Sequence, residues 1–305
     1  MKIIICDVGD AACAFVSSSN GKTMMIDCGC SLGSDKTNPV DIFHQYKDWL
    51  SDGHFTGYYH NGTAYPIALL HITHPDDDHI RNARRVVNEL TPYLVLKNDC
   101  ELFPDGHEIN NEYKELIDRK YRGNYSNPID LGFEINETCC IPVDVCAKNN
   151  DLSSKVRNNS SIIRYIYDNG VGILFCGDLE RPGWDYLVRN NPDFINTLKR
   201  HGVKILVAPH HGHKSGFPKA LFDAIGQVDV VIHSKDTEAS KEGTDVSSQY
   251  SSMADGHTYE VNNAIYSGKV LTTRSNGHIF IETSGYGNYA IYACSASPNH
   301  KRLLY

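Results

Sequence analysis

Three short segments of the chain concentrate side chains that can bind metal ions or transfer protons. The densest covers residues 74–79 and reads His-Pro-Asp-Asp-Asp-His, directly after an apolar run. Adjacent carboxylates repel one another, and a bound cation removes that cost. Imidazole and carboxylate together suit Zn²⁺, Mn²⁺ or iron. A solvated acidic turn is the alternative for the three aspartates alone, but the two flanking histidines favour a metal site.

The other two segments also follow apolar runs. Asp178 comes after one such run and a single glycine, where it is either a metal ligand or the N-cap of the next helix. The third segment can supply a ligand, a proton donor and an anion-binding pair, through His210, His211, His213, Lys214 and Ser215. A surface loop with spare histidines is the alternative for that segment by itself. Because all three segments begin where a strand is expected to end, we expect them to converge on one edge of stacked sheets.

The elements that would position these segments alternate between strands and helices. Apolar runs predict strands over residues 2–6, 12–16, 23–27, 66–72, 161–167, 171–176, 203–208 and 228–233. Helical spacing predicts helices over residues 40–50, 80–90, 108–120, 183–200 and 218–226. Strand pairs close the chain, 269–273 with 278–282 and then 289–294. This order predicts an α/β fold in which two mixed β-sheets pack face to face with helices outside, an αββα sandwich.

The composition predicts one domain over residues 1–305, with two inserts. The pattern weakens near residues 98–150, and residues 235–256 are polar and serine-rich, which is typical of a long mobile surface loop. With 41% hydrophobic and 22% charged residues, the chain has the composition of a soluble globular protein. No apolar run reaches the ~18 residues that a membrane span needs. The first residues lack the pattern of a signal peptide, so we expect a cytoplasmic protein with no membrane partner.

The cysteines and the net charge indicate which kinds of structural site and which partners the protein is expected to have. Without a secretory signal, the ten cysteines are expected to be free buried thiols rather than disulfides or zinc knuckles. The net charge of −8 argues against a tight, nonspecific grip on long nucleic acid. It does not exclude a nuclease, because bound divalent ions reverse the sign of the local field.

These segments together resemble the metallo-β-lactamase superfamily. Its motif His-x-His-x-Asp-His corresponds here to His74-x-Asp76-x-Asp78-His79, with Asp in place of the second His. That variant is similar to the soluble hydrolase domain of competence-type DNA-uptake proteins and its stand-alone relatives. Further segments that resemble this branch are Asp7-Val8-Gly9, Ile26-Asp27-x-Gly29, residues 158–161, Gly177-Asp178, residues 209–212 with Ser215, Gly256-His257 and residues 273–277.

Two features depart from that branch. Asp10-Ala11-Ala12 stands where the branch usually has Gly-Asp soon after its opening segment. The third histidine motif of the superfamily has no evident counterpart before Asp178, and residues 158–161 occupy that region. The second departure leaves open whether the protein holds one divalent ion or two.

The resemblance implies a metal centre of one or two divalent ions, Zn²⁺ or Mn²⁺, with Asp178 as the bridge. One ion would take His74 and Asp76, and the other would take Asp78, His79 and either His211 or His210. A water molecule with its pKa lowered toward neutrality would be the nucleophile.

The resemblance also implies roles for the side chains around the metals. The leaving group would take its proton from the remaining histidine of the pair, from His213 or from His257. Asn159, Lys214 and Ser215 would hold a substrate phosphate.

Carboxylate-rich ligation favours a phosphodiester over a β-lactam. The sequence therefore predicts a phosphodiesterase, either a nuclease or a hydrolase of small or cyclic nucleotides, with a nucleotide or nucleic acid as its partner. A hydrolase of a lactone, thioester or amide is one alternative. A metal-stabilised binding module without turnover is the other.

Overall fold

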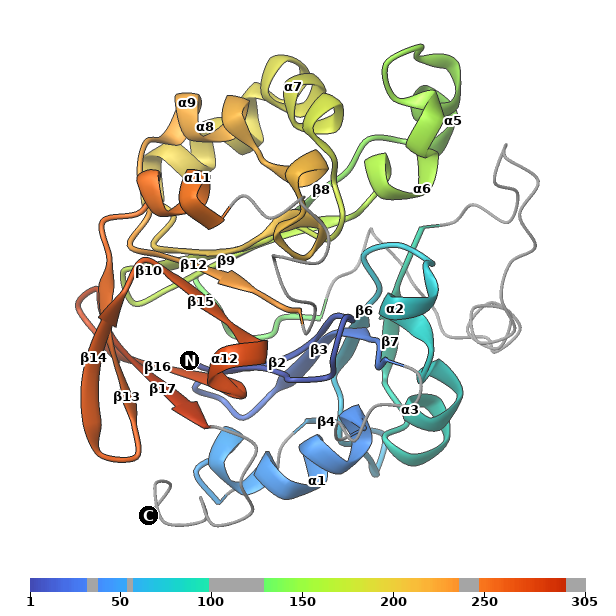
Figure 1. Cartoon of the computed structure of the whole chain (residues 1–305). Helices are drawn as coiled ribbons and strands as arrows, with labels where there is room; N and C mark the ends of the chain where they lie inside the picture. Colours follow the sequence, from blue (N-terminus) through green and yellow to red (C-terminus); the bar gives the residue numbers. More distant parts are fainter. Residues whose placement is uncertain (32–37, 54–56, 99–128, 236–246, 295–305) are drawn as a thin grey trace.

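The computed structural model describes residues 1–31, 38–53, 57–98, 129–235 and 247–294 (Figure 1). Two β-sheets lie face to face, and helices cover the outer face of each sheet. The predicted α/β architecture, an αββα sandwich of two mixed sheets, is therefore confirmed. That all 305 residues form one domain stays a prediction.

The larger sheet has nine strands in the order β14-β13-β17-β16-β1-β2-β3-β6-β7. In chain order they are β1 (Lys2–Ile5), β2 (Cys13–Ser17), β3 (Thr23–Cys28), β6 (Leu69–His71), β7 (Leu94–Leu96), β13 (His257–Val261), β14 (Ala264–Gly268), β16 (His278–Gly285) and β17 (Asn288–Cys294). The pairs β3–β6 and β6–β7 are parallel, whereas β1, β2 and β3 pair antiparallel. The carboxyl ends of β3 and β6 therefore lie at the same edge.

The smaller sheet has six strands in the order β15-β12-β11-β10-β9-β8. They are β8 (Ile135–Cys139), β9 (Ile163–Asp168), β10 (Val171–Phe175), β11 (Ile205–Val207), β12 (Val230–His233) and β15 (Val270–Thr272). Strands β10, β11, β12 and β15 run parallel, so their carboxyl ends also share one edge. A separate two-stranded sheet joins β4 (Tyr58–His60) to β5 (Thr63–Tyr65).

Helices connect these strands. They are α1 (Pro39–Leu50), α2 (Asp77–Ile80), α3 (Ala83–Glu89), α5 (Val143–Lys148), α6 (Val156–Asn159), α7 (Arg181–Asn190), α8 (Pro192–His201), α9 (Lys219–Ile225), α11 (Ser247–Ser252) and α12 (Thr273–Asn276). Short 3₁₀ turns are η1 (Ser153–Lys155), η2 (Pro209–Gly212) and η3 (Lys214–Gly216). Helix α1 begins one residue before the predicted range of 40–50, because Asn38 accepts a hydrogen bond from the Val40 amide (2.9 Å) and Pro39 occupies the first turn.

Side chains that alternate along the strands fill three apolar layers. In β1, Ile3 and Ile5 pack between the two sheets, whereas Ile4 packs on the opposite face with Phe43 of α1. The outer face of the six-stranded sheet packs against α7, α8 and α9, where Trp184 is fully buried. Both faces of the central strands are therefore covered, which makes the strand ends rigid supports for polar loops.

Several local expectations are corrected. Residues 183–200 form two helices, because Pro192 lacks the amide proton that a continuous helix needs. Strand β15 pairs with β12 in the smaller sheet rather than with residues 278–282. The expected loop 235–256 contains α11, whose Tyr250 is fully buried. The helix expected over residues 108–120 lies outside the described residues.

The structure also bears on the expected state of the cysteines and on the expected lack of membrane spans. All nine cysteines in the described ranges have free thiols, as predicted, but only six are buried, and Cys30, Cys140 and Cys294 are partly exposed. In the same ranges, no helix has the length and hydropathy that crossing a membrane requires.

Candidate metal centre

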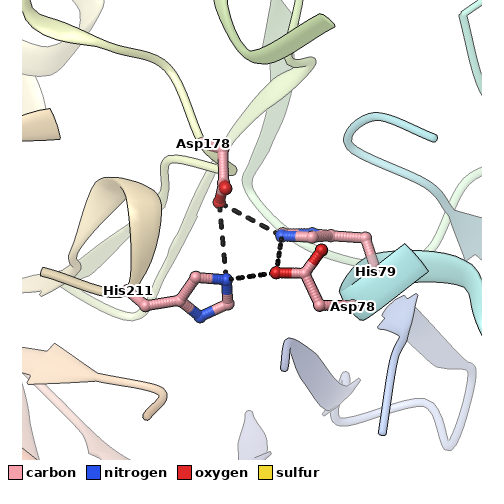
Figure 2. Close-up of side chains that lie close together, drawn as sticks. All are labelled: Asp78, His79, Asp178 and His211. Atoms are coloured by element: carbon pink, nitrogen blue, oxygen red, sulfur yellow. Dashed lines mark hydrogen bonds and ion pairs between the residues drawn. The ribbon is translucent and has the colours of Figure 1, made fainter. Parts of the chain in front are cut away.

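The three predicted segments meet at one edge of the sandwich. Asp78 and His79 follow β6, Asp178 follows β10, and His211 follows β11. Figure 2 shows these four side chains pointing toward one another. One ligand atom from each lies within 4.8 Å of the others, which is the spacing of donors around a single metal ion. The predicted convergence of the segments is confirmed.

Asp178 lies at the middle of a larger arrangement, because each of its carboxylate oxygens faces two histidines. Its Oδ1 lies 3.1 Å from Nε2 of His79 and 3.8 Å from Nε2 of His211. Its Oδ2 lies 3.8 Å from Nε2 of His74 and 3.7 Å from Nε2 of His210. Both members of the 210–211 pair therefore approach Asp178, on opposite sides, where the sequence left the choice between them open.

The remaining aspartates divide between these two sides. Oδ2 of Asp78 lies 3.1 Å from His211 Nε2 and 3.9 Å from His79 Nε2. Oδ2 of Asp76 lies 3.7 Å from His74 Nε2. We call Asp78, His79, His211 and Oδ1 of Asp178 the first subsite. The second subsite comprises His74, Asp76, His210 and Oδ2 of Asp178.

In the first subsite, fixed partners hold Nδ1 of each histidine. His79 Nδ1 donates to Oδ2 of Asp27 (2.8 Å), and His211 Nδ1 donates to the Ser234 carbonyl (2.7 Å). Carboxylate and carbonyl oxygens only accept, so the proton of each neutral ring sits on Nδ1. In this neutral form each Nε2 has a lone pair directed toward Asp178, which is the tautomer that a metal ligand needs.

The second subsite has the same pattern with hydroxyl partners. Nδ1 of His74 lies 3.2 Å from Thr73 Oγ1, and Nδ1 of His210 lies 2.9 Å from Ser215 Oγ. Thr73 Oγ1 donates its own proton to Asp27, so it accepts from the imidazole. Ser215 Oγ contacts Glu180 Oε1 at 3.3 Å, which leaves it an acceptor toward His210. All four Nε2 atoms are thus turned to Asp178 by neighbouring groups.

Backbone strain helps to aim these rings. His210 (φ 50°) and His211 (φ 54°) are consecutive residues in the left-handed region, where each costs about 1–2 kcal/mol. Between them these angles direct one ring to each side of Asp178. Gly212 (φ 82°) continues the loop, and a Cβ there would lie 2.4 Å from the His233 ring. The strain is therefore local to the residues that approach the centre.

The chemistry of the donor set fits a divalent cation. Within the described ranges, His74 Nε2 is buried without a hydrogen-bond partner, and the buried atoms His79 Nε2 and Asp178 Oδ1 face only each other, at 3.1 Å. A buried polar atom without a partner costs about 1–3 kcal/mol. One or two ions held by these nitrogen and oxygen donors would remove that cost, and Zn²⁺ or Mn²⁺ suits the mixture.

Charge interactions shift the pKa values of these groups strongly. Burial acts to lower the pKa of His211, but Asp178 and Asp78 outweigh it and raise that pKa to about 9. His79 behaves alike: burial opposes protonation, and Asp178 and Asp27 raise its pKa well above the usual value. Burial acts against ionisation of Asp178, yet His79 and His211 hold its pKa well below its usual value. Protonated His79 and His211 thus balance the charge of the carboxylates, and a metal ion would compete with their protons.

The three predicted substrate-binding residues differ in whether a substrate could reach them. Lys214 is exposed at the start of η3. Ser215 instead holds His210, as described above. Asn159 is only 1% exposed, and its side-chain amide donates to the Leu152 carbonyl (3.1 Å). Its short motif gave no information about burial, and the structure does not present Asn159 to a substrate.

Two of the predicted proton donors, His213 and His257, also differ in position. His213 lies beside the centre, with its ring centroid 5.0 Å from that of His210. His257 begins β13, toward the other end of the nine-stranded sheet from β6. There its ring stacks on Tyr289 at 4.1 Å. We therefore withdraw His257 as a proton donor, because a strand on the far side of the sheet carries it.

Sequence reasoning missed the residues that support the ligands. Asp27 accepts from the Thr73 amide (2.7 Å), the Thr73 hydroxyl (2.8 Å) and His79 (2.8 Å). Arg157 donates from Nε to Oδ1 of Asp76 at 2.6 Å. Asp27 was visible only as part of a resembling segment, and Arg157 and Glu180 stood in no recognisable pattern.

Comparisons with known proteins give little further detail. No protein-family model matches the chain, and no curated protein is similar at a significant level. Among solved structures, the metallo-beta-lactamase fold protein YhfI from Bacillus subtilis is 8% identical, with 91% of this chain and 99% of that one covered and a TM-score of 0.47. A protein of unknown function from Enterococcus faecalis is 12% identical over 68% of this chain and 49% of that one, with a TM-score of 0.31. Both TM-scores are below 0.5, so the sandwich architecture rests on the two sheets and their helices alone.

Proposed function

We propose that the protein is a metal-dependent hydrolase of the metallo-β-lactamase superfamily that cleaves phosphodiesters. The observation that carries this proposal is the position of Asp178, whose two carboxylate oxygens each face two histidine Nε2 atoms. A carboxylate with ligands on both sides is suited to bridging two divalent ions. The buried donors without hydrogen-bond partners support the same assignment.

Divalent ions at this centre would supply Lewis acidity, polarising the group under attack and making water nucleophilic near neutral pH. The chain's own residues have distinct tasks. Asp27 keeps the proton of His79 on Nδ1, and Ser234 does the same for His211. Asp178 fixes the separation of the two subsites. His213 lies close enough to the centre to deliver a proton to a leaving oxygen.

A phosphodiester is the substrate class that the donor set favours. Three carboxylates, from Asp76, Asp78 and Asp178, approach the subsites, and oxygen-rich ligation suits hard ions such as Mn²⁺ that bind phosphoryl oxygens. The exposed Lys214 beside the histidine loop would attract an anionic substrate. Within this class, we propose a nucleotide or nucleic acid as the substrate.

A second candidate is hydrolysis of a lactone, thioester or amide. One observation favours it: the small, mostly buried cavity beside His79, Asp178 and His211 is otherwise largely lined by apolar side chains such as Cys13 and Phe175. An apolar wall suits an uncharged acyl group better than a phosphate.

One experiment separates these candidates. The purified protein, loaded with Mn²⁺ or Zn²⁺ and checked by elemental analysis, is incubated with single-stranded DNA, RNA, cyclic dinucleotides and a panel of lactones and thioesters. We expect turnover of at least one phosphodiester, and its loss in Asp178→Asn. The matched control is Asp77→Asn, since Asp77 belongs to the same aspartate run but pairs with Arg81 outside both subsites. A metal-loaded protein that turns over only the acyl substrates would contradict the phosphodiesterase assignment, and one that turns over nothing would favour a binding module.

A further inference from the structure

Arg157 contacts a ligand of one subsite directly. It lies on α6, and its Nε donates to Oδ1 of Asp76 at 2.6 Å. Both side chains are 26% exposed, so the pair lies at the border between the centre and solvent. The other oxygen of Asp76, Oδ2, faces His74 Nε2 at 3.7 Å. Asp76 is therefore shared between a guanidinium cation and the second subsite.

The carboxylates of the first subsite have different partners. In the portion of the chain that the structure describes, the ion-pair partners of Asp78 and Asp178 are histidines, and no lysine or arginine pairs with either. Its four donor atoms also lie within 4.8 Å of one another. The first subsite therefore combines spacing that suits one ion with carboxylates that remain fully available to it.

We propose that Arg157 makes the second subsite the weaker of two unequal metal sites. Its positive charge repels a divalent ion at His74 and Asp76, and it withdraws electron density from the carboxylate that the ion needs. When the second subsite is empty, the same guanidinium balances the charge of Asp76. One ion thus binds tightly beside Asp78, and a second binds only at higher metal concentration. This inference rests on the metal centre proposed above, but on no particular substrate.

A competing role for Arg157 makes the opposite prediction. If Arg157 served only to orient Asp76, its loss would weaken the second ion, as loss of a hydrogen-bonded partner of a ligand usually does. Arg157→Gln removes the charge but keeps a side-chain amide that can donate to Asp76. Arg157→Lys keeps the charge but changes the shape of the donor. The two variants therefore separate charge from orientation.

The chain offers a closely matched control. Arg81 pairs with Asp77 (3.6 Å) in the same acidic run, and its side chain is 27% exposed. Because Asp77 belongs to neither subsite, Arg81→Gln removes one positive charge near the centre without releasing a ligand.

The test is an equilibrium titration of the metal-free protein with Mn²⁺, in which the free ion is followed by electron paramagnetic resonance. Elemental analysis after dialysis gives the number of ions retained. We expect two ions with affinities that differ on the order of tenfold or more, and Arg157→Gln to tighten the weaker one on the order of tenfold. Arg157→Lys and Arg81→Gln should leave the ratio as in the wild type.

Each other outcome counts against a defined part of the account. Two equal affinities in the wild type, or a weaker second ion in Arg157→Gln, would overturn the role of Arg157. If the Gln variant folds poorly, the ratio of the two affinities in the wild type and in Arg157→Lys still tests the role of Arg157. Binding of no ion at all would instead contradict the metal centre. Since no substrate is present, failure to find a hydrolytic activity leaves the titration interpretable.

Discussion

The two subsites flank the same carboxylate, yet their surroundings differ. In the first, His79 is 1% exposed and is held by the buried carboxylate of Asp27, which is itself anchored at the end of β3. In the second, the side chain of His210 is 27% exposed, and a loop serine and Glu180 hold it. A ligand fixed by a buried strand end is already in place for the metal, whereas a ligand on a loop can adjust. Together with the position of Arg157, this difference between His79 and His210 leads us to expect tighter binding at the first subsite than at the second.

The largest expected effect comes from the residue that both subsites share. Asp178→Asn removes the negative charge that the two ions would share, so we expect activity to fall at least on the order of a thousandfold and the metal content to drop. Elemental analysis and initial rates measure both. Asp77→Asn, which lies outside the subsites, should retain metal and activity; equal losses in the two variants would mean that the aspartate run acts only through overall charge.

Asp27→Asn tests mainly the first subsite, because Asp27 contacts His79 directly but reaches His74 only through Thr73. The amide is a poorer acceptor for His79, so the first ion should bind on the order of 10- to 100-fold more weakly. Thr73 also loses charge-assisted hydrogen bonds, which should lower the free energy of unfolding. Mn²⁺ titration and urea denaturation measure the two effects. If the first ion bound as tightly as in the wild type, the support of His79 by Asp27 would not matter for the metal.

The affinity of the first subsite for metal should depend on pH through His211. In the metal-free protein the pKa of His211 is raised to about 9, so at pH 7 an ion must displace its proton. The affinity of the first ion should therefore rise with pH up to about 9, by at most about tenfold per pH unit for each proton released.

The metal-free protein should show the opposite trend. A histidine whose pKa is raised in the folded state stabilises the fold fully below its unfolded pKa of about 6.5, and this stabilisation is lost as the pH rises through about 9. With a chelator present, urea denaturation between pH 6.5 and 9 should give a declining free energy of unfolding. His211→Asn should flatten that decline, and an unchanged slope would contradict the protonated state of His211.

The smallest effect is expected for Glu180→Gln. Glu180 lies 3.5 Å from His210 Nδ1, and Ser215 still accepts from that nitrogen. We expect the second ion to weaken by less than about tenfold while the first is unchanged. A weaker first ion in this variant would mean that the two subsites are not separable.

The sequence predicted which segments form the centre, but not which histidine of the 210–211 pair faces Asp178. Apolar runs followed at once by His74, Asp178 and His210 indicated strand ends, and the buried strands place them together. Whether His210 or His211 would face the centre was not predictable, because the left-handed backbone angles that turn both rings inward are a property of the folded loop.

The supporting residues were not predictable for a related reason. Arg157 and Glu180 act through contacts between segments distant in the sequence, and no local pattern encodes such contacts. For Asn159 and His257 the sequence predicted roles at the centre that the structure contradicts. Each stands in a familiar short motif, yet one is buried and the other belongs to a distant strand.

The most direct test of the metal centre is a crystal structure of the protein soaked in Mn²⁺, with anomalous scattering recorded at the metal edge. We predict two peaks, one on each side of Asp178. The peak beside Asp78, His79 and His211 should be fully occupied, and the peak beside His74 should fill only at high Mn²⁺ concentration. Anomalous density that avoids Asp178 altogether would contradict the account.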